Sequence, residues 1–161
     1  MSPTQAAAAR QDYRRFLTEQ GFKEEHVRAA VENHSDMVPM PPEFDALELR
    51  RSPIAGRGLF TTRDVEAGDI LAPARLAGKR TPAGRYTNHG PIPNAQMVPQ
   101  SNGDLFLVAS EDIARGTEVL VDYRQAGEAA GHDVAPKRPH MVAPAMRRAE
   151  EAASRAAELR N

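Results

Sequence analysis

The most polar stretch in the middle of the sequence is residues 85–94, which read Arg-Tyr-Thr-Asn-His-Gly-Pro-Ile-Pro-Asn. It holds a guanidinium, a phenol, an imidazole and two side-chain amides, too many polar groups for an ordinary core strand. Pro91 and Pro93 stiffen its end and remove two backbone donors. These groups could bind a polar ligand, or His89 could be a buried structural residue with satisfied hydrogen bonds. The residue types support both interpretations equally.

Two further segments could take part in binding or catalysis. Residues 56–60 are Gly-Arg-Gly-Leu-Phe, and a Gly-x-Gly turn before a strand lets the backbone come close to a ligand. The same turn could be purely structural, and it is no dinucleotide-binding fingerprint, because no third glycine and no helix follow. Residues 118–123 form a strand-like run that ends in Asp122 and Tyr123. The phenol of Tyr123 either has a function or simply meets water at a strand edge.

Short strands and turns must position these groups. Strand-like runs separated by Gly, Pro and Asn lie at 47–49, 58–60, 105–108 and 119–121. Residues 59–68 and 107–116 repeat one pattern, 48 positions apart: two apolar residues, a polar turn with Asp, a β-branched residue and Gly. The repeat predicts two similar β-corners that meet in space. Two copies are too few for a solenoid.

The composition excludes several classes of protein. The 161 residues, 40% of them hydrophobic, suit one domain with appendages. The absence of cysteine excludes disulfide scaffolds, thiolate zinc sites, iron–sulfur clusters and a cysteine nucleophile. A net charge of −1 gives no overall field for nucleic acid or an anionic membrane. The other histidines lack metal-ligand spacing. Without a leader-like start or an apolar run of 18 residues, we expect a cytoplasmic protein with no metal site.

In this order the three segments resemble the SET-domain family of protein lysine methyltransferases, in the minimal form found in bacteria and phages. The resemblance covers roughly Leu47 to Arg124. It rests on Gly-x-Gly-Leu-Phe at 56–60, on Arg-Tyr-x-Asn-His and Pro-Asn within 85–94, and on Gly-x-Glu-x-x-x-Asp-Tyr at 116–123. It implies a mainly β fold with flanking helices. Its core would be a β-clip of short curled sheets, with a threaded C-terminal strand that brings the second and third segments together.

The resemblance also implies an activity and a site. The activity would be transfer of a methyl group from S-adenosylmethionine to a lysine side chain of a protein substrate. Tyr123 would be the catalytic phenol that orients the incoming amine. The residues expected to bind the cofactor are Gly56, Arg57, Gly58, Arg85, Tyr86, Asn88 and His89. The implied partner is a lysine-containing protein, with no direct contact to nucleic acid or membrane.

The sequence departs from the family at three places. Only fourteen residues, 71–84, stand where the family has a longer insert that forms one wall of the peptide groove. Gly90 replaces the usual serine, and no aromatic residue follows Tyr123. The candidates for that missing aromatic are Arg124, Tyr13, Phe16 and Phe22. The N-terminal helices or a second subunit, in a homodimer, could complete the substrate side. The alternative function is a catalytically inactive SET-like module for binding or assembly.

Three domains or segments are predicted. Residues 1–43 form an N-terminal helical segment, with helices within 4–33, and a Pro-rich linker. Residues 44–124 form the SET-like domain. Residues 125–161 form an Ala-rich tail, helical from about residue 144, where Pro144 suits a first helical turn.

Overall fold

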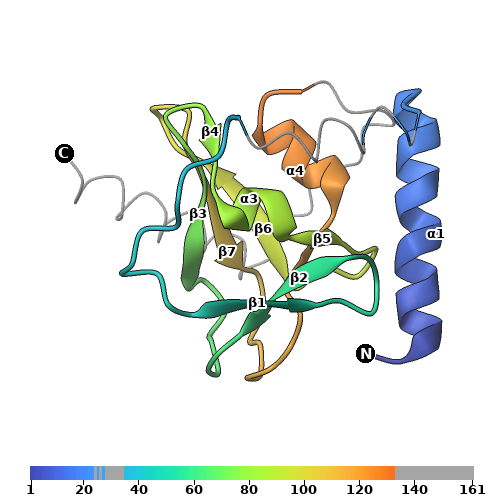
Figure 1. Ribbon diagram of the computed structural model, residues 1–161, viewed down its shortest axis with the longest axis horizontal. Coiled ribbons are helices and arrows are strands. Elements are labelled where there is room, and N and C mark those ends of the chain that lie inside the picture. Colours follow the sequence, from blue (N-terminus) through green and yellow to red (C-terminus); the bar gives the residue numbers. More distant parts are fainter. Residues whose placement is uncertain (24, 26, 28–34, 133–161) are drawn as a thin grey trace.

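The computed structural model describes residues 1–23, 25, 27 and 35–132. Small sheets with mostly antiparallel pairing make up the centre, and helices flank them (Figure 1). The strands are β1 Leu47–Arg51, β2 Arg57–Thr61, β3 Ile70–Leu76, β4 Lys79–Arg80, β5 Asn88–His89, β6 Ala95–Pro99, β7 Leu105–Ala109 and β8 Leu120–Val121, and the helices are α1 Pro3–Gln20, α3 Pro82–Tyr86 and α4 Tyr123–Ala129. The predicted mainly β fold with flanking helices is confirmed, and the threaded β-clip stays a prediction.

The largest sheet has the order β4-β3-β7-β6, with antiparallel neighbours. Every residue of β7 is buried, because β7 has a partner strand on each side and packed side chains on both faces. Leu105 and Leu107 belong to the main core, whereas Phe106 and Val108 form a smaller cluster, as the two-residue period of a strand requires. The β3–β7 register shifts between Pro73 and Arg75, where proline has no N–H for the ladder.

The two β-corners predicted from the sequence repeat meet in space. Val65 and Ile113 exchange two backbone hydrogen bonds of 2.9 Å. Asp64 accepts a hydrogen bond of 2.8 Å from a backbone N–H of the second corner, and Asp112 accepts one of 2.9 Å from the equivalent N–H of the first. Each aspartate of the repeat therefore closes the opposite corner, and the two corners form a nearly symmetric pair.

The segment at 118–121 joins the strands that carry the other two motifs. Glu118 forms a bridge to Phe60 of β2, and β8 pairs in parallel with β5. The side chain of Asn94 secures this arrangement. Its amide donates to the carbonyl oxygen of Glu118 and its oxygen accepts the N–H of Leu120, both at 2.9 Å. Three distant parts of the sequence are thereby held side by side.

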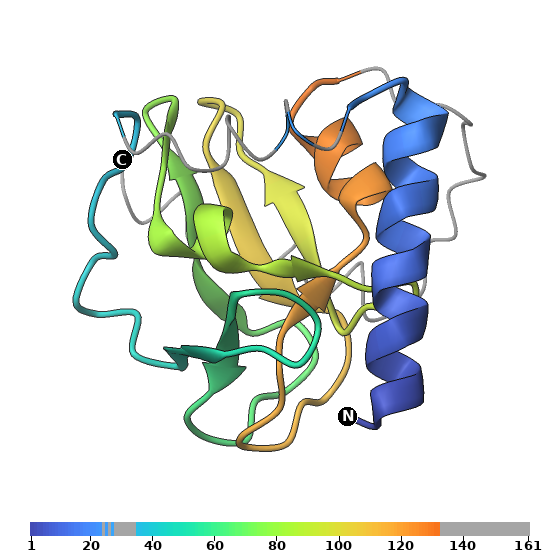
Figure 2. The ribbon, with the colours of Figure 1, turned by 45° about the vertical axis from the view of Figure 1, so that its right-hand side comes forward.

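Helix α1 begins and ends where local sequence signals require. The side chains and backbone N–H groups of Ser2 and Gln5 form a reciprocal capping box, and Gly21 ends the helix with a φ of 70°. One side of α1 packs on the β core beside α4 and β5 (Figure 2); its buried residues are Ala6, Ala9 and Leu17. Within the described residues, no helix combines the length and apolar character needed to cross a bilayer.

Some predicted elements differ or lie elsewhere. The strand-like run at 118–123 is a strand only at β8, because the carboxylate of Asp122 accepts the N–H of Arg124 and starts α4 at Tyr123. Helix α4 crosses the boundary predicted after residue 124. Most of a second N-terminal helix at 23–33, and the tail helix from about 144, lie outside the described residues.

We expect Asn94→Ala to lower the free energy of unfolding by about 2–4 kcal/mol, since it leaves two polar groups of the 118–121 segment without their buried partner. Chemical denaturation measures the loss. Asn102→Ala, the same change in an exposed turn, is the matched control and should cost less. Equal losses for the two variants would contradict the role assigned to Asn94.

Candidate functional site

A cavity of about 880 Å³ opens between α1, the turn before β2, α3, β5 and α4. Seven of the eight site residues predicted from the sequence line it: Gly56, Arg57, Arg85, Tyr86, Asn88, His89 and Tyr123. The three motifs, which are separate in the sequence, therefore share one cavity. The eighth residue, Gly58, is not among those that line it.

Two hydrogen bonds hold His89 in one tautomer. Its ring is 2% exposed. The backbone N–H of Tyr123 donates to Nδ1 at 3.0 Å, so this nitrogen carries no proton. Nε2 therefore holds the proton and donates it to the carboxylate of Asp12 at 2.7 Å. The next residue, Gly90, packs against the side chain of Leu120, and a methyl group at position 90 would come within 2.8 Å of that side chain. This packing accounts for the glycine where the family has serine.

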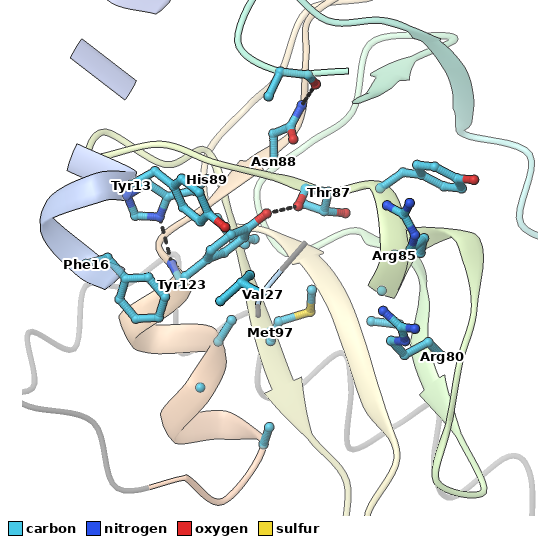
Figure 3. Close-up of a pocket in the computed structure, with 18 of the residues that line it drawn as sticks. Tyr13, Phe16, Val27, Arg80, Arg85, Thr87, Asn88, His89, Met97 and Tyr123 are labelled. Carbon is cyan, nitrogen blue, oxygen red and sulfur yellow. Dashed lines mark hydrogen bonds between the residues drawn. The ribbon is translucent and has the colours of Figure 1, made fainter. Parts of the chain in front are cut away.

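The phenol of Tyr123 lies in the centre of the site (Figure 3). Its hydroxyl donates to the carbonyl oxygen of Thr87 at 2.8 Å. Burial, together with the nearby Tyr13, raises the pKa of Tyr123 above its ordinary value of 10.0. The phenol is therefore neutral at physiological pH. Since its proton is engaged with Thr87, its oxygen remains able to accept a hydrogen bond from a ligand.

Asn88 links the glycine turn to Glu118 of the third motif. Its amide donates to Glu118 at 2.8 Å and to the carbonyl oxygen of Ala55 at 3.2 Å. Glu118, 5% exposed, also accepts a hydrogen bond of 2.9 Å from Ser52. Gly58 is small because a side chain there would collide with the carboxylate of Glu118. The structure thus gives Gly58 a packing role beside the site.

Helix α1 supplies aromatic residues around Tyr123. Tyr13 and Phe16 meet its ring edge-on, with ring centroids 5.7 and 5.9 Å away. Phe16 also stacks on His89 at 6.2 Å, and Phe22 meets Phe16 at 6.5 Å. Of the candidates for the missing aromatic residue, Tyr13 and Phe16 are in direct contact with Tyr123.

Arg124, the remaining candidate, is not among the residues that line the cavity, and it holds α1 in place. It is 3% exposed. Its guanidinium donates to Glu19 at 2.8 Å, to Asp12 at 2.9 Å and to Asp122 at 3.3 Å. Burial alone would lower the pKa of Arg124, but these carboxylates outweigh it and raise the pKa, so the charge is permanent. Arg124 is therefore an anchor between α4 and α1.

Asp12 and Glu118 are site residues that sequence reasoning missed. The partners of Asp12, His89 and Arg124, are 77 and 112 positions away, so no local spacing marks it. Glu118 carried one signal, its place in the Gly-x-Glu part of the third motif. Within the described residues, no group of three or more histidines and carboxylates could hold a metal ion.

We expect Asp12→Asn to lower the free energy of unfolding at pH 7 by about 1.5–3 kcal/mol, the cost of losing hydrogen bonds to charged groups. Burial alone would raise the pKa of Asp12, but the hydrogen bonds from Arg124 and His89 lower it below 3.8. A lowered pKa stabilises the fold above the ordinary pKa, and this contribution disappears as the pH falls through the folded-state value.

Stability curves of the wild type and Asp12→Asn should therefore converge as the pH falls below 3.8. The control is Asp45→Asn, which removes an exposed ion pair with Arg63 and should cost less. A loss from Asp12→Asn that does not change with pH would contradict the charge-based role of Asp12.

A match to a protein-family model supports the resemblance. Residues 75–124 match the family model described as the SET domain. A crystal structure of a provisionally assigned histone methyltransferase from Plasmodium falciparum aligns over 48% of this chain and 92% of its own, with 16% identity and a TM-score of 0.39. No curated protein matches the chain significantly. The matched segment contains the second and third motifs and Tyr123, and the resemblance to the SET domain that the motifs predict is thus confirmed for residues 75–124.

Proposed function

We propose that the protein is an S-adenosylmethionine-dependent methyltransferase that acts on a lysine side chain of a protein substrate. One observation carries the proposal: Gly56 and Arg57 of the glycine turn, the Asn88–His89 pair and the phenol of Tyr123 meet at one cavity. Such a meeting is what methyl transfer between two bound molecules requires, because most of the rate gain comes from holding both reactants in line.

The cavity fits the cofactor in three respects. Its volume of about 880 Å³ lies within the range of small-molecule sites, about 300–1,000 Å³. Gly56 has a φ of 48° and open space where a side chain would stand, so its backbone is accessible to a ligand. Nε of Arg85 is buried without a hydrogen-bond partner, and the guanidinium stacks on Tyr86 with 4.6 Å from Cζ to the ring centroid. A ligand carboxylate would satisfy it.

The predicted cofactor residues that line the cavity would therefore hold S-adenosylmethionine, which when bound would supply a transferable methyl group. The phenol oxygen of Tyr123 would accept a hydrogen bond from an N–H of the substrate amine, while its own hydroxyl continues to donate to the carbonyl oxygen of Thr87. This hydrogen bond would aim the amine lone pair. The aromatic rings of Tyr13 and Phe16 would exclude water and disfavour the ammonium form, which lowers the pKa of an entering lysine.

The competing function is a catalytically inactive binding or assembly module. It is favoured by the short substrate side, where most of β3, β4 and the start of α3 occupy residues 71–84 in place of the family's longer insert. Isothermal titration with S-adenosylmethionine separates the two, since only the enzyme requires the cofactor. Absence of heat from a folded sample at high protein concentration would favour the inactive module.

We expect Tyr123→Phe to reduce methyl transfer by about 100-fold or more, because the amine loses its aiming acceptor. Cofactor affinity should change less than about threefold, since the ring still packs against Tyr13 and Phe16. The measurement is radiolabelled methyl transfer to host-cell lysate, with titration of the cofactor as the control for an intact site. A variant that keeps most of its turnover would remove Tyr123 from the mechanism.

A further inference from the structure

Among the described residues that line the cavity, every permanently charged side chain is a cation. Five are arginines, and no aspartate or glutamate joins them: Arg10, Arg57, Arg75, Arg80 and Arg85. The chain as a whole has 21 basic and 22 acidic residues, so an excess of arginine does not explain this. Positive charge is therefore concentrated at the cavity.

Most of these cations stand at one end of the cavity. Arg75 of β3 and Arg80 of β4 are direct cross-strand partners, and Lys79, which pairs with Leu76, lies exposed near the tip of the same hairpin. Figure 3 shows Arg80 and Arg85 on one side of the site and Tyr13 and Phe16 on the other, with Tyr123 and Thr87 between them. No acidic residue occurs in the sequence from 70 to 103. We call Arg75, Lys79 and Arg80 the basic hairpin.

One carboxylate of the chain already pairs with the basic hairpin. Asp36 accepts two hydrogen bonds of 2.8 Å from Arg80, a bidentate ion pair. The pKa of Asp36 is lowered mainly by this hydrogen bonding with Arg80, with a further contribution from Arg75. Arg75 and Lys79 form no ion pair with any described residue. Like charges placed opposite each other in a sheet are unfavourable, so a second source of negative charge would stabilise the hairpin.

The charge of the reactants decides what that source is. Both a sulfonium cofactor and a lysine ammonium are cations, and a cationic cavity repels them unless nearby anions compensate. The cofactor's single carboxylate can be held by Arg85, whose Nε lacks a partner. That leaves Arg75 and Lys79 for anions of the substrate itself.

We propose that the basic hairpin binds acidic residues that flank the target lysine, so that the substrate is an acidic segment of a protein. This inference rests on the proposed function. The same cations that attract the flanking carboxylates would keep the lysine amine neutral near Tyr123, because a positive neighbour disfavours the ammonium form.

Peptides with one central lysine and flanking glutamates, glutamines or arginines test the proposal. Binding is measured by fluorescence anisotropy with S-adenosylhomocysteine present, at low and high salt, and methyl transfer is measured on the same peptides. We expect the glutamate peptide to bind about tenfold or more tightly than the glutamine peptide at low salt. The difference should shrink at high salt, as electrostatic screening requires. The arginine peptide should bind weakest.

The variant Arg75→Glu/Lys79→Glu should reduce the glutamate preference to about twofold or less. The matched control is Arg14→Glu/Arg15→Glu, the same double charge reversal at exposed residues of α1, and it should retain the preference. Affinity for S-adenosylmethionine should fall by less than about threefold in both variants, since neither removes Arg85, the residue assigned to the cofactor carboxylate. An equal loss of cofactor affinity and peptide affinity in Arg75→Glu/Lys79→Glu would instead assign the hairpin to the cofactor carboxylate and overturn the proposal.

Two further outcomes would overturn it: an acidic preference that survives the double reversal, or an arginine peptide that binds as well as the glutamate peptide. An oligonucleotide that displaces the glutamate peptide at equal concentration would also overturn it in favour of a nucleic-acid surface. Transfer to all peptides at the same rate refutes the substrate class alone. Glutamate-selective binding without any cofactor binding refutes the methyltransferase and supports the docking surface.

Discussion

The whole site depends on one carboxylate that two different segments share. Asp12 of α1 accepts from Nε2 of His89 at 2.7 Å and from Arg124 at 2.9 Å. A buried arginine is tolerated only when carboxylates compensate its charge, so α1 must lie against α4 for Arg124 to be buried at all. With α1 in this place, its aromatic face meets Tyr123.

Three consecutive residues, 122–124, fix the geometry of the site. The carboxylate of Asp122 starts α4, the backbone N–H of Tyr123 fixes the tautomer of His89, and the side chain of Arg124 binds α1. Tyr123 is therefore held at both ends: its backbone N–H by His89 and its hydroxyl by the carbonyl oxygen of Thr87. A residue that orients an amine needs this kind of fixed position, since small displacements cost much of the rate gained from orientation.

The features that could be predicted from the sequence are those that a repeated pattern or a set of motifs marks. The repeated Asp-turn-Gly pattern predicted the paired corners, and motif order predicted that Tyr123 would reach Asn88 and His89. What it could not predict are pairings between isolated residues far apart in the chain. Asp12 looks like any polar residue of a helix, because nothing within its own segment records the arginine it will bind. Gly58 was interpreted as a contact for the cofactor, yet the carboxylate of Glu118 occupies the space beside it.

These pairings also show why residues 75–124 do not form the site alone, although they match the family model. The buried polar groups of this segment take their partners from outside it: His89 and Arg124 from α1, and Asn88 and Glu118 from the turn before β2. Excised, the segment would keep the hydrogen bonds among these groups but lose the partners outside it, at a cost of about 1–3 kcal/mol for each buried polar group left unsatisfied. Losses at several such groups would be comparable to the roughly 5–15 kcal/mol by which a domain is normally stable. The N-terminal helix is thus as much a part of the site as the strands that carry the motifs.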